Sequence, residues 1–248
     1  MPRYAIRVAY DGTHYHGWQR QQGVPTVQAT LEQCLTTLLR EPITLFAAGR
    51  TDTGVHAKGQ VAHFDTSQED LVSGRILLGS KALLPRDIVI KELFHVKDDF
   101  HARFDAQWRQ YRYRILRQSS PFERDLAWVV YPWPETTLLI QAASVLSGEH
   151  DFTAFCKADS ALETNRCTIM HAEWEFINQE GVDFVIRANR FLHHMVRGLV
   201  GTMIRQAQHE NIKEFNELID QGIRSEAVFT APAKGLFLEE IGYIKENH

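Results

Sequence analysis

The feature that most constrains the fold of this chain is an order of strands and helices that occurs twice. In the first half, alternating apolar residues predict a strand over residues 4–10, and an apolar stripe predicts a helix that begins at about Thr26. Strands over 43–48 and 60–65, a helix over 70–83 and a strand over 88–94 follow. This order, β-α-β-β-α-β, is typical of a ferredoxin-like unit.

The second half repeats this order. It contains a strand over 108–116, a helix over 136–147 that ends at Gly148, strands over 168–176 and 182–188, helices over 191–208 and 213–220, and a strand over 236–243. The middle strands are expected to form a hairpin through Asn178-Gln179-Glu180-Gly181. We therefore predict an α+β fold with domains over 1–104 and 105–248. The two ferredoxin-like halves are expected to form one mixed, largely antiparallel sheet with helices on one face.

The composition is that of an ordinary globular protein, with 248 residues, 44% hydrophobic and 23% charged. No apolar run approaches membrane-spanning length, and the N-terminus lacks the pattern of a signal or transit peptide, so we expect no membrane partner. The three cysteines are scattered, which argues against a disulfide framework. This pattern favours a reducing compartment, so we expect a cytoplasmic location.

One loop has the features of a catalytic site. The residues Gly49-Arg50-Thr51-Asp52-Thr53-Gly54-Val55-His56-Ala57 lie between two predicted strands, with Gly49, Gly54 and Gly59 providing backbone freedom. Asp52 stands two residues from the permanent cation of Arg50, an arrangement that suits chemistry. The alternative is an Asx-turn in which Asp52 caps its own loop, and the loop alone slightly favours this alternative.

Other motif interpretations fit less well. Asp52-Thr53-Gly54 matches the aspartic proteases, but these need two such carboxylates that share a proton, and this chain has one copy. A phosphate-binding loop requires Lys-Ser/Thr where Val55-His56 stands. A metal site built from His56, His63, Asp65 and the pair His14 and His16 has no supporting spacing, so no metal is expected.

Two basic clusters are candidates for contact with nucleic acid. The net charge is −4, so any such surface must be local. The first cluster contains Arg103, Arg109, Arg112, Arg114 and Arg117, interleaved with Phe104, Trp108, Tyr111 and Tyr113. The second contains Arg187, Arg190, His193, His194 and Arg197, of which residues 190, 194 and 197 are expected on one helix face. Core tyrosines and solvated arginines are the alternative for the first cluster, and an exposed helix charge is the alternative for Arg197.

With these segments in view, the chain resembles the TruA-type tRNA pseudouridine synthases along nearly its whole length. The resemblance is carried by Ala9-Tyr10-Asp11-Gly12-Thr13, Gly17-Trp18-Gln19, the Asp52 loop, Ala82-Leu83-Leu84-Pro85, Phe100-His101-Ala102-Arg103-Phe104, Tyr111-Arg112-Tyr113, Gly148-Glu149-His150-Asp151-Phe152, His193-His194-Met195-Val196-Arg197 and Gly235-Leu236. One departure is Lys81, where the family often has asparagine.

The resemblance implies the pseudouridine synthase fold and a homodimer in which each tRNA contacts both subunits. It implies isomerisation of uridine to pseudouridine at positions 38, 39 and 40 in the anticodon stem-loop of tRNA, without a cofactor. Asp52 matches the catalytic aspartate, Tyr111 the active-site tyrosine and Arg197 the basic partner of the aspartate. Arg50 matches a loop arginine that helps to expel the target base, and Leu236 an apolar pocket wall. Further RNA contacts are expected from Arg109, Arg112, Arg114, His193 and His194.

This assignment agrees with the chemistry that the residues can perform. The isomerisation needs no redox change or external energy, and the sequence shows no nucleotide or metal signature. Asp52 would act as a nucleophile or as a base, and both roles remain open. A competing hypothesis is an RNA-binding module that has kept the fold without catalysis.

Overall fold

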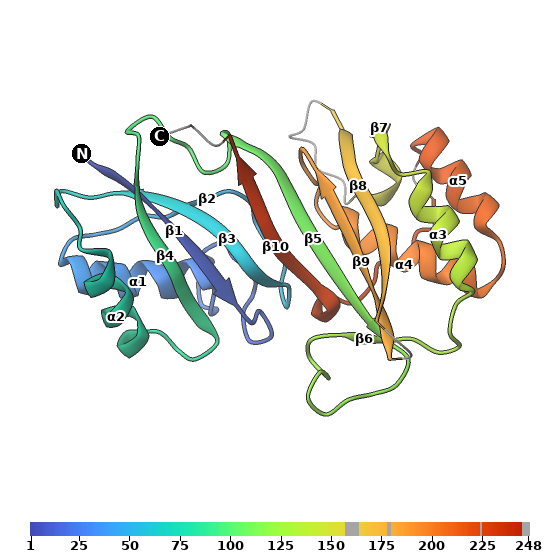
Figure 1. Cartoon of the computed structure of the whole chain (residues 1–248), viewed down its shortest axis with the longest axis horizontal. Helices are drawn as coiled ribbons and strands as arrows, with labels where there is room; N and C mark the ends of the chain where they lie inside the picture. Colours follow the sequence, from blue (N-terminus) through green and yellow to red (C-terminus); the bar gives the residue numbers. More distant parts are fainter. Residues whose placement is uncertain (157–163, 178–179, 224, 245–248) are drawn as a thin grey trace. The chain divides into compact units, whose positions relative to one another are not determined.

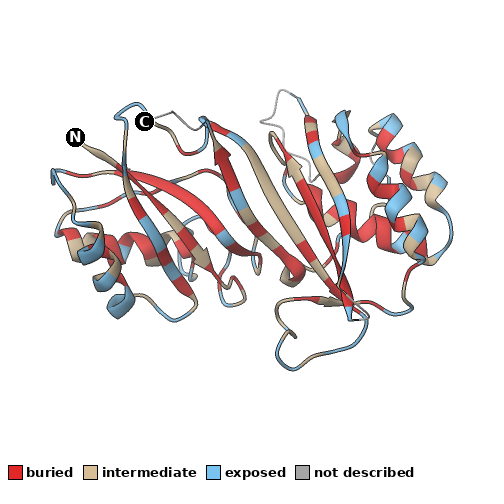
Figure 2. Cartoon of the chain, in the orientation of Figure 1, coloured by how far each residue is buried: buried red, intermediate tan, exposed pale blue. Residues whose placement is uncertain are grey.

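The computed structural model describes residues 1–156, 164–177, 180–223 and 225–244. Within these residues the chain forms ten strands and five α-helices, which confirms the α+β class (Figure 1). Contacts divide the chain into two compact units. Unit 1 contains Met1–Gln107 and the residues from Phe237 onward, and unit 2 contains Trp108–Leu236. In both units the buried residues follow the strands and the sides of the helices that pack on them (Figure 2).

Unit 1 has the predicted ferredoxin-like order. Its elements are β1 (Arg3–Tyr10), α1 (Val27–Leu39), β2 (Phe46–Ala47), β3 (His56–Asp65), α2 (Ser73–Leu83), β4 (Ile88–Val96) and, from the end of the chain, β10 (Leu236–Tyr243). Strand β1 lies between β3 and β4 and is antiparallel to both. Strand β2 pairs with β3 antiparallel, whereas β10 pairs with β3 in parallel. The pairing is therefore mixed and largely antiparallel, as predicted.

In helix α1 the predicted apolar stripe is buried at Val27, Leu31, Cys34 and Leu35, whereas its last residue, Leu38, is half-buried. The segment that follows differs from the prediction. Only two residues of the expected strand over 43–48 pair as strand β2. The N–H groups of Ile43 and Leu45 instead bond to the side chains of Thr36 and Glu32 on α1. The segment is buried at Ile43 and Leu45 without being an extended strand.

Strand β3 is buried on both faces, where the sequence predicted alternation. The reason is visible at His63, which is 2% exposed. Its ring stacks on Phe46 at 5.2 Å, and its Nδ1 accepts a hydrogen bond of 3.2 Å from the N–H of Ala102. Burial, followed by the nearby charge of Arg3, lowers the pKa of His63 to about 4. The polar residues His56, Gln60 and His63 of this strand therefore form part of the core.

Unit 2 contains β5 (Ala106–Leu116), β6 (Trp128–Val129), α3 (Thr136–Ser144), β7 (Gly148–Asp151), β8 (Arg166–Ile177), β9 (Gly181–Ala188), α4 (Met195–Gln208) and α5 (Ile212–Gln221). The strand order is β5-β9-β8-β7, antiparallel throughout, and β6 pairs with β5 in parallel. Helices α3, α4 and α5 pack against one another (Figure 1). Residues 178 and 179 of the predicted hairpin turn lie outside the described residues, but its two strands pair as expected.

Two features of unit 2 differ from the predictions. Helix α3 ends at Ser144, and Gly148 opens strand β7, which the sequence did not predict. Gly148 has a φ of +102°, and the backbone after it pairs with β8 from Gly148↔Ile169 to Asp151↔Arg166. The predicted domain division also differs, since β10 pairs with β3 and groups with unit 1 from Phe237 onward.

Candidate functional site

The Asp52 loop connects β2 to β3, and its first residues are bonded to β3. The N–H of Ala48 bonds to the carbonyl of Val61 at 2.8 Å, and the Gln60 side chain donates to the carbonyl of Gly49 at 2.8 Å. Within the loop, the N–H of Val55 bonds to the carbonyl of Asp52 at 3.1 Å. Gly54 has a φ of +76°, in the region that glycine adopts readily, as predicted. The carboxylate of Asp52 is therefore carried by a turn of defined geometry.

A second segment, residues 10–18, packs against this loop. The N–H of Trp18 bonds to the carbonyl of Thr51 at 3.1 Å, and the N–H of Gly54 bonds to the carbonyl of Tyr15 at 3.3 Å. A Cβ at Gly12 would lie 2.0 Å from the carbonyl oxygen of Val55, and a Cβ at Gly17 would lie 2.6 Å from that of Thr51. Glycine is required at both positions because the two backbones touch.

Asp11 and His56 tie the same two segments together. The Asp11 carboxylate accepts hydrogen bonds from the N–H of Thr13 at 3.0 Å and from its hydroxyl at 2.6 Å. Burial would raise the pKa of Asp11, but the bonds from Thr13 together with the neighbouring His56 outweigh it and lower the pKa. Nδ1 of His56 lies 3.0 Å from the N–H of Gly12 and 3.0 Å from Asp11 Oδ1. We assign Nδ1 as the acceptor, because the backbone N–H can only donate.

Arg50 and Asp52 differ in their exposure. The Arg50 side chain is exposed, whereas Asp52 is half-buried and the intervening Thr51 is buried. The bond from Val55 uses the main-chain carbonyl of Asp52, so it does not test the alternative in which the Asp52 carboxylate caps an Asx-turn. The carboxylate oxygens are the atoms that a catalytic role requires.

The two tyrosines of strand β5 have different environments. Tyr113 is fully buried and donates a hydrogen bond of 2.7 Å to the carbonyl of Pro232. Burial raises its pKa well above the ordinary value. Tyr111 is half-buried and meets the ring of Phe191 edge-on, with centroids 5.0 Å apart and planes at 88°. Tyr113 is therefore a core residue, and Tyr111 is the tyrosine that is suited to a site.

Arg197 lies in the first turn of α4 and is held by the chain segment around residue 231. Its Nε donates to the carbonyl of Ala231 at 2.8 Å, and the N–H of Ala231 donates to the carbonyl of Arg197 at 3.0 Å. This reciprocal pair fixes the direction of the guanidinium. Gly201 permits the contact, since a Cβ there would lie 2.1 Å from the carbonyl oxygen of Phe229.

The predicted start of this helix was wrong. Helix α4 begins at Met195, because His194 has a φ of +67°, which an α-helix does not accept. Arg190 and His194 precede the helix, so they do not share a helix face with Arg197. His193 and His194 lie with their ring centroids 4.2 Å apart. A non-glycine residue in this conformation is uncommon and is often found at functional sites.

The arginines of strand β5 are engaged within unit 2. Arg109 donates to the carbonyl of Asn189 at 2.8 Å. Arg112 pairs with Asp183 at 3.0 Å and with the more exposed Glu175 at 2.6 Å. Arg114 pairs with Asp183 at 3.3 Å and with Glu123 at 3.0 Å. The Asp183 side chain is 2% exposed, so two arginines share one buried carboxylate. This ion-pair network was not anticipated from the sequence.

Leu236 is 5% exposed and follows directly after Gly235. A Cβ at Gly235 would lie 2.7 Å from the Tyr113 ring and 2.8 Å from the carbonyl oxygen of Arg114. The pair Gly235-Leu236 is therefore fixed by close packing on strand β5. This explains why a glycine stands before the predicted apolar pocket wall.

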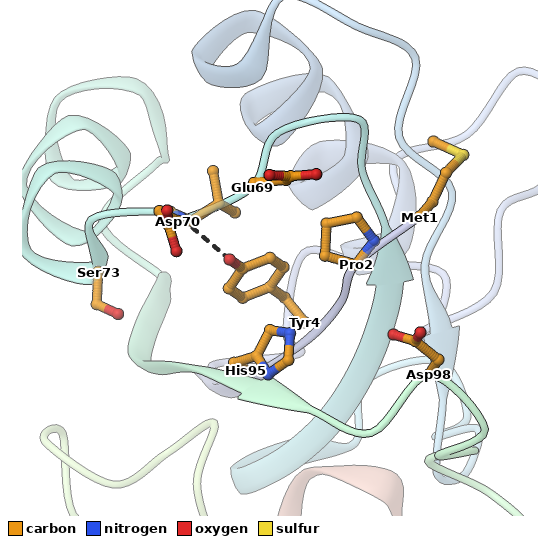
Figure 3. Close-up of a pocket in the computed structure, with 9 residues that line it drawn as sticks. Met1, Pro2, Tyr4, Glu69, Asp70, Ser73, His95 and Asp98 are labelled. Carbon is orange, nitrogen blue, oxygen red and sulfur yellow. Dashed lines mark hydrogen bonds between the residues drawn. The ribbon is translucent and has the colours of Figure 1, made fainter.

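A depression of about 650 Å³ is present in unit 1 (Figure 3). It is lined by Met1, Pro2, Tyr4, Glu69, Asp70, Leu71, Ser73, His95 and Asp98. None of the predicted site residues lines it, and its acidic side chains would repel an RNA phosphate. We therefore do not assign the site to this depression.

Sequence reasoning missed the residues that support the Asp52 loop, namely Tyr10, Asp11, Gly12, Gly17 and His56. They belong to motifs that the sequence marks, but their partners are up to 44 residues away along the chain. Nothing in the local pattern indicates which segments meet. The pairing of Asp52 in unit 1 with Tyr111 and Arg197 in unit 2 remains a prediction.

The chain is similar in sequence to known tRNA pseudouridine synthases. A family described as tRNA pseudouridine synthase matches residues 6–105 and 142–244. A tRNA pseudouridine synthase A from Bacteroides fragilis is 40% identical over 99% of this chain and 98% of that protein. One from Porphyromonas gingivalis is 41% identical over 98% of each chain. One from Escherichia coli O1:K1 / APEC is 38% identical over 96% of this chain and 89% of that protein.

The family match includes the Asp52 loop, the segment around residues 10–18 that packs on it, and the helix that carries Arg197. Identities near 40% over almost the full length accompany this match in relatives from several bacteria. The chain therefore belongs to the tRNA pseudouridine synthase family.

Proposed function

We propose that this protein isomerises uridine to pseudouridine at positions 38, 39 and 40 in the anticodon stem-loop of tRNA. The observation that carries the proposal is the family match over both units, together with an Asp52 loop that is fixed by buried contacts. The relatives named above are tRNA pseudouridine synthases, and the anticodon positions follow from the resemblance to the TruA type.

The reaction breaks the N1–C1′ bond, turns the base, joins C5 to C1′ and removes the C5 proton. No electrons are gained or lost. The C5 proton leaves to solvent and the freed N1 takes up a proton from solvent, so the product has the same composition as the substrate. The protein must therefore supply a reactive carboxylate, a means of holding the detached base and an acceptor for the C5 proton.

We assign the reactive carboxylate to Asp52, as nucleophile or base towards the ribose. Arg197 is assigned as its partner, because a guanidinium can hold a carboxylate through two parallel hydrogen bonds. Because Arg197 Nε donates to the carbonyl of Ala231, the direction in which the two terminal nitrogens of the guanidinium point is defined. A carboxylate that is held in this way loses little freedom when the substrate arrives, which favours catalysis by orientation.

Tyr111 is assigned to the target base. A uridine within a stem must leave its stack before it can react, at a cost of a few kcal/mol, and stacking on an aromatic ring contributes about 1–3 kcal/mol per base. Tyr111 is half-buried and held edge-on by Phe191, so its position is defined. We assign Arg50, which is exposed on the same loop as Asp52, to the space that the base vacates.

The remaining RNA contacts are proposed for Arg109, His193, His194 and Leu236, with Leu236 as an apolar wall of the base pocket. Arg112 and Arg114 are proposed to contribute less to phosphate binding than their charge indicates. Both are paired with Asp183, which neutralises part of their field. Phosphate contacts of this kind read the shape of A-form RNA and weaken with salt.

Two properties of the whole protein are also proposed. The resemblance implies a homodimer in which each tRNA contacts both subunits, and sedimentation of the protein with and without tRNA tests it.

The scattered cysteines suggest a cytoplasmic location, and Cys34, Cys156 and Cys167 are all free thiols. Among the described residues, no helix has the length and apolarity needed to span a bilayer.

The test is release of tritium from tRNA that carries C5-labelled uridine. The wild-type protein should release tritium, and Asp52→Ala and Asp52→Asn should release none while still binding tRNA. Release by Asp52→Asn under conditions that exclude deamidation would refute the catalytic assignment. An RNA-binding module without catalysis would bind tRNA but release no tritium even as wild type.

A further inference from the structure

Tyr10 ends strand β1 and is buried against the Asp52 loop. Its side chain is 4% exposed, and its ring packs on that of Trp18 with centroids 5.9 Å apart. The Tyr10 hydroxyl lies 2.8 Å from Oγ1 of Thr51, in a buried hydrogen bond. Thr51 is 6% exposed and directly precedes Asp52. Strand β1 therefore reaches the residue next to the proposed catalytic carboxylate.

Thr51 is held at two points. Besides the hydrogen bond between its hydroxyl and that of Tyr10, its carbonyl accepts a hydrogen bond of 3.1 Å from the N–H of Trp18. The backbone of Gly17 lies so close that a Cβ there would stand 2.6 Å from the same carbonyl oxygen. With the hydroxyl and the carbonyl both fixed, the direction in which the chain continues to Asp52 is restricted.

From these contacts we infer that Tyr10 is a positioning residue for Asp52 and acts through the hydroxyl of Thr51. The inference rests on the proposed function, in which Asp52 is the reacting carboxylate. Tyr10 does not need to touch the substrate in this role. Its contribution is to hold the carboxylate in the orientation that the ribose requires, and displacement of a reacting group by about 1 Å can lower a rate by about 100-fold.

The first measurement compares Tyr10→Phe with the wild-type full-length protein on a tRNA transcript. The substitution keeps the ring that packs on Trp18 and removes only the hydroxyl. We expect kcat to fall by about 10- to 100-fold, because the carboxylate is no longer held, while KM for tRNA stays within about 2-fold.

Tyr4→Phe is the matched control. Tyr4 lies on the same strand, is 5% exposed, and its hydroxyl accepts a hydrogen bond of 3.0 Å from the N–H of Leu71, in the depression described above (Figure 3). Loss of this hydroxyl should lower the melting temperature about as much as loss of the Tyr10 hydroxyl. It should leave kcat unchanged, because Leu71 is not part of the Asp52 loop.

Thr51 provides the second variant. Thr51→Val removes the hydroxyl with little change in shape, and it should lower kcat as Tyr10→Phe does. The double variant should be no worse than either single variant, because both remove the same hydrogen bond. Thr51→Ser keeps the hydroxyl and should retain at least half of the wild-type kcat. Such rescue is not expected if Thr51 only fills space.

The outcomes separate this inference from the proposed function. If Asp52→Asn is inactive while Tyr10→Phe keeps full kcat, Tyr10 is not a positioning residue and the proposed function stands. A raised KM with unchanged kcat would make Tyr10 an RNA contact and overturn the inference. Equal losses of kcat in Tyr10→Phe and Tyr4→Phe, in proportion to melting temperature, would also overturn it. If Asp52→Asn remains active, the proposed role of Asp52 fails, and the inference fails with it.

Discussion

At the scale of single residues, Tyr111 and Tyr113 separate catalysis from packing. They lie on the same face of β5, yet Tyr113 is buried and bonded to Pro232 while Tyr111 is half-buried beside Phe191. Tyr111→Phe should lower tRNA turnover by about 10- to 100-fold with little change in binding. Tyr113→Phe should cost about 1 kcal/mol of stability and leave turnover unchanged. Equal turnover of wild type and Tyr111→Phe would remove the Tyr111 hydroxyl from the mechanism.

His63 predicts how stability changes with pH. Its pKa is about 4 in the folded protein, below the ordinary histidine value of 6.5, so the unfolded chain binds more protons between these values. The stability that the neutral, buried His63 contributes to the folded protein is fully present above pH 6.5 and is lost as the pH falls towards 4. At pH 5 the loss should be about 2 kcal/mol.

Urea unfolding at about pH 7.5 and about pH 5 measures this effect, since the two conditions lie on either side of the ordinary histidine pKa. In His63→Asn most of the difference in unfolding free energy between the two pH values should disappear. His14 is exposed, so His14→Asn should keep the difference seen in the wild type. The carboxylates whose pKa is lowered, such as Asp11 and Asp65, titrate below this window. A pH dependence in His63→Asn as steep as in wild type would contradict the assignment.

At the scale of elements, the contact between the 10–18 segment and the Asp52 loop depends on glycine. Gly17 and Gly23 both have positive φ, +83° and +79°. In the described part of the chain, a Cβ at Gly23 would meet no atom within 4 Å, whereas one at Gly17 would meet the carbonyl oxygen of Thr51 at 2.6 Å. Gly23→Ala should therefore cost about 1–2 kcal/mol for the backbone alone.

Gly17→Ala should cost more than Gly23→Ala and should also reduce kcat, because the Asp52 loop must move to make room. Urea unfolding and tRNA turnover of the two variants give the comparison. The idea is wrong if the two substitutions have the same effect on both quantities.

The pairing of β5 with β9 gives a second prediction at this scale. Asp183→Ala removes the buried partner of Arg112 and Arg114. It should lower the free energy of unfolding by about 2–3 kcal/mol, less than for a fully buried ion pair, because solvent screens the partly exposed arginines. Glu175→Ala removes the exposed partner of Arg112, at 45% side-chain exposure, and should cost about 0–1 kcal/mol. Equal losses of unfolding free energy for the two variants, measured by chemical denaturation, would show that burial of Asp183 does not matter.

The elements that the sequence predicted well are those with a regular apolar period. Helix α1 and strand β10 fall almost where the periodicity places them. The start of α4 was missed because a single backbone angle at His194 decides it, and β7 was missed because its four residues carry no alternation. Strand β3 lost its alternation because aromatic residues from distant segments cover its second face.

At the scale of the whole molecule, the sequence predicts the site residues through resemblance, whereas the contacts that support the Asp52 loop needed the structure. The hydrogen bond between Tyr10 and Thr51 joins residues 41 positions apart, and no local pattern predicts such a pairing. The same holds for Asp183, which bonds to arginines about 70 positions earlier in the chain. Long-range contacts of this kind decide which charged residues are free to act on a substrate and which hold the fold.

The proposed isomerisation of uridine in the anticodon stem-loop depends on the carboxylate of Asp52. The decisive experiment maps pseudouridine in an unmodified tRNA transcript after incubation with the wild-type protein or with Asp52→Asn. We expect pseudouridine at positions 38, 39 and 40 wherever the transcript has uridine there, from wild type alone. Pseudouridine at other positions only, or equal modification by Asp52→Asn, would contradict the proposed function.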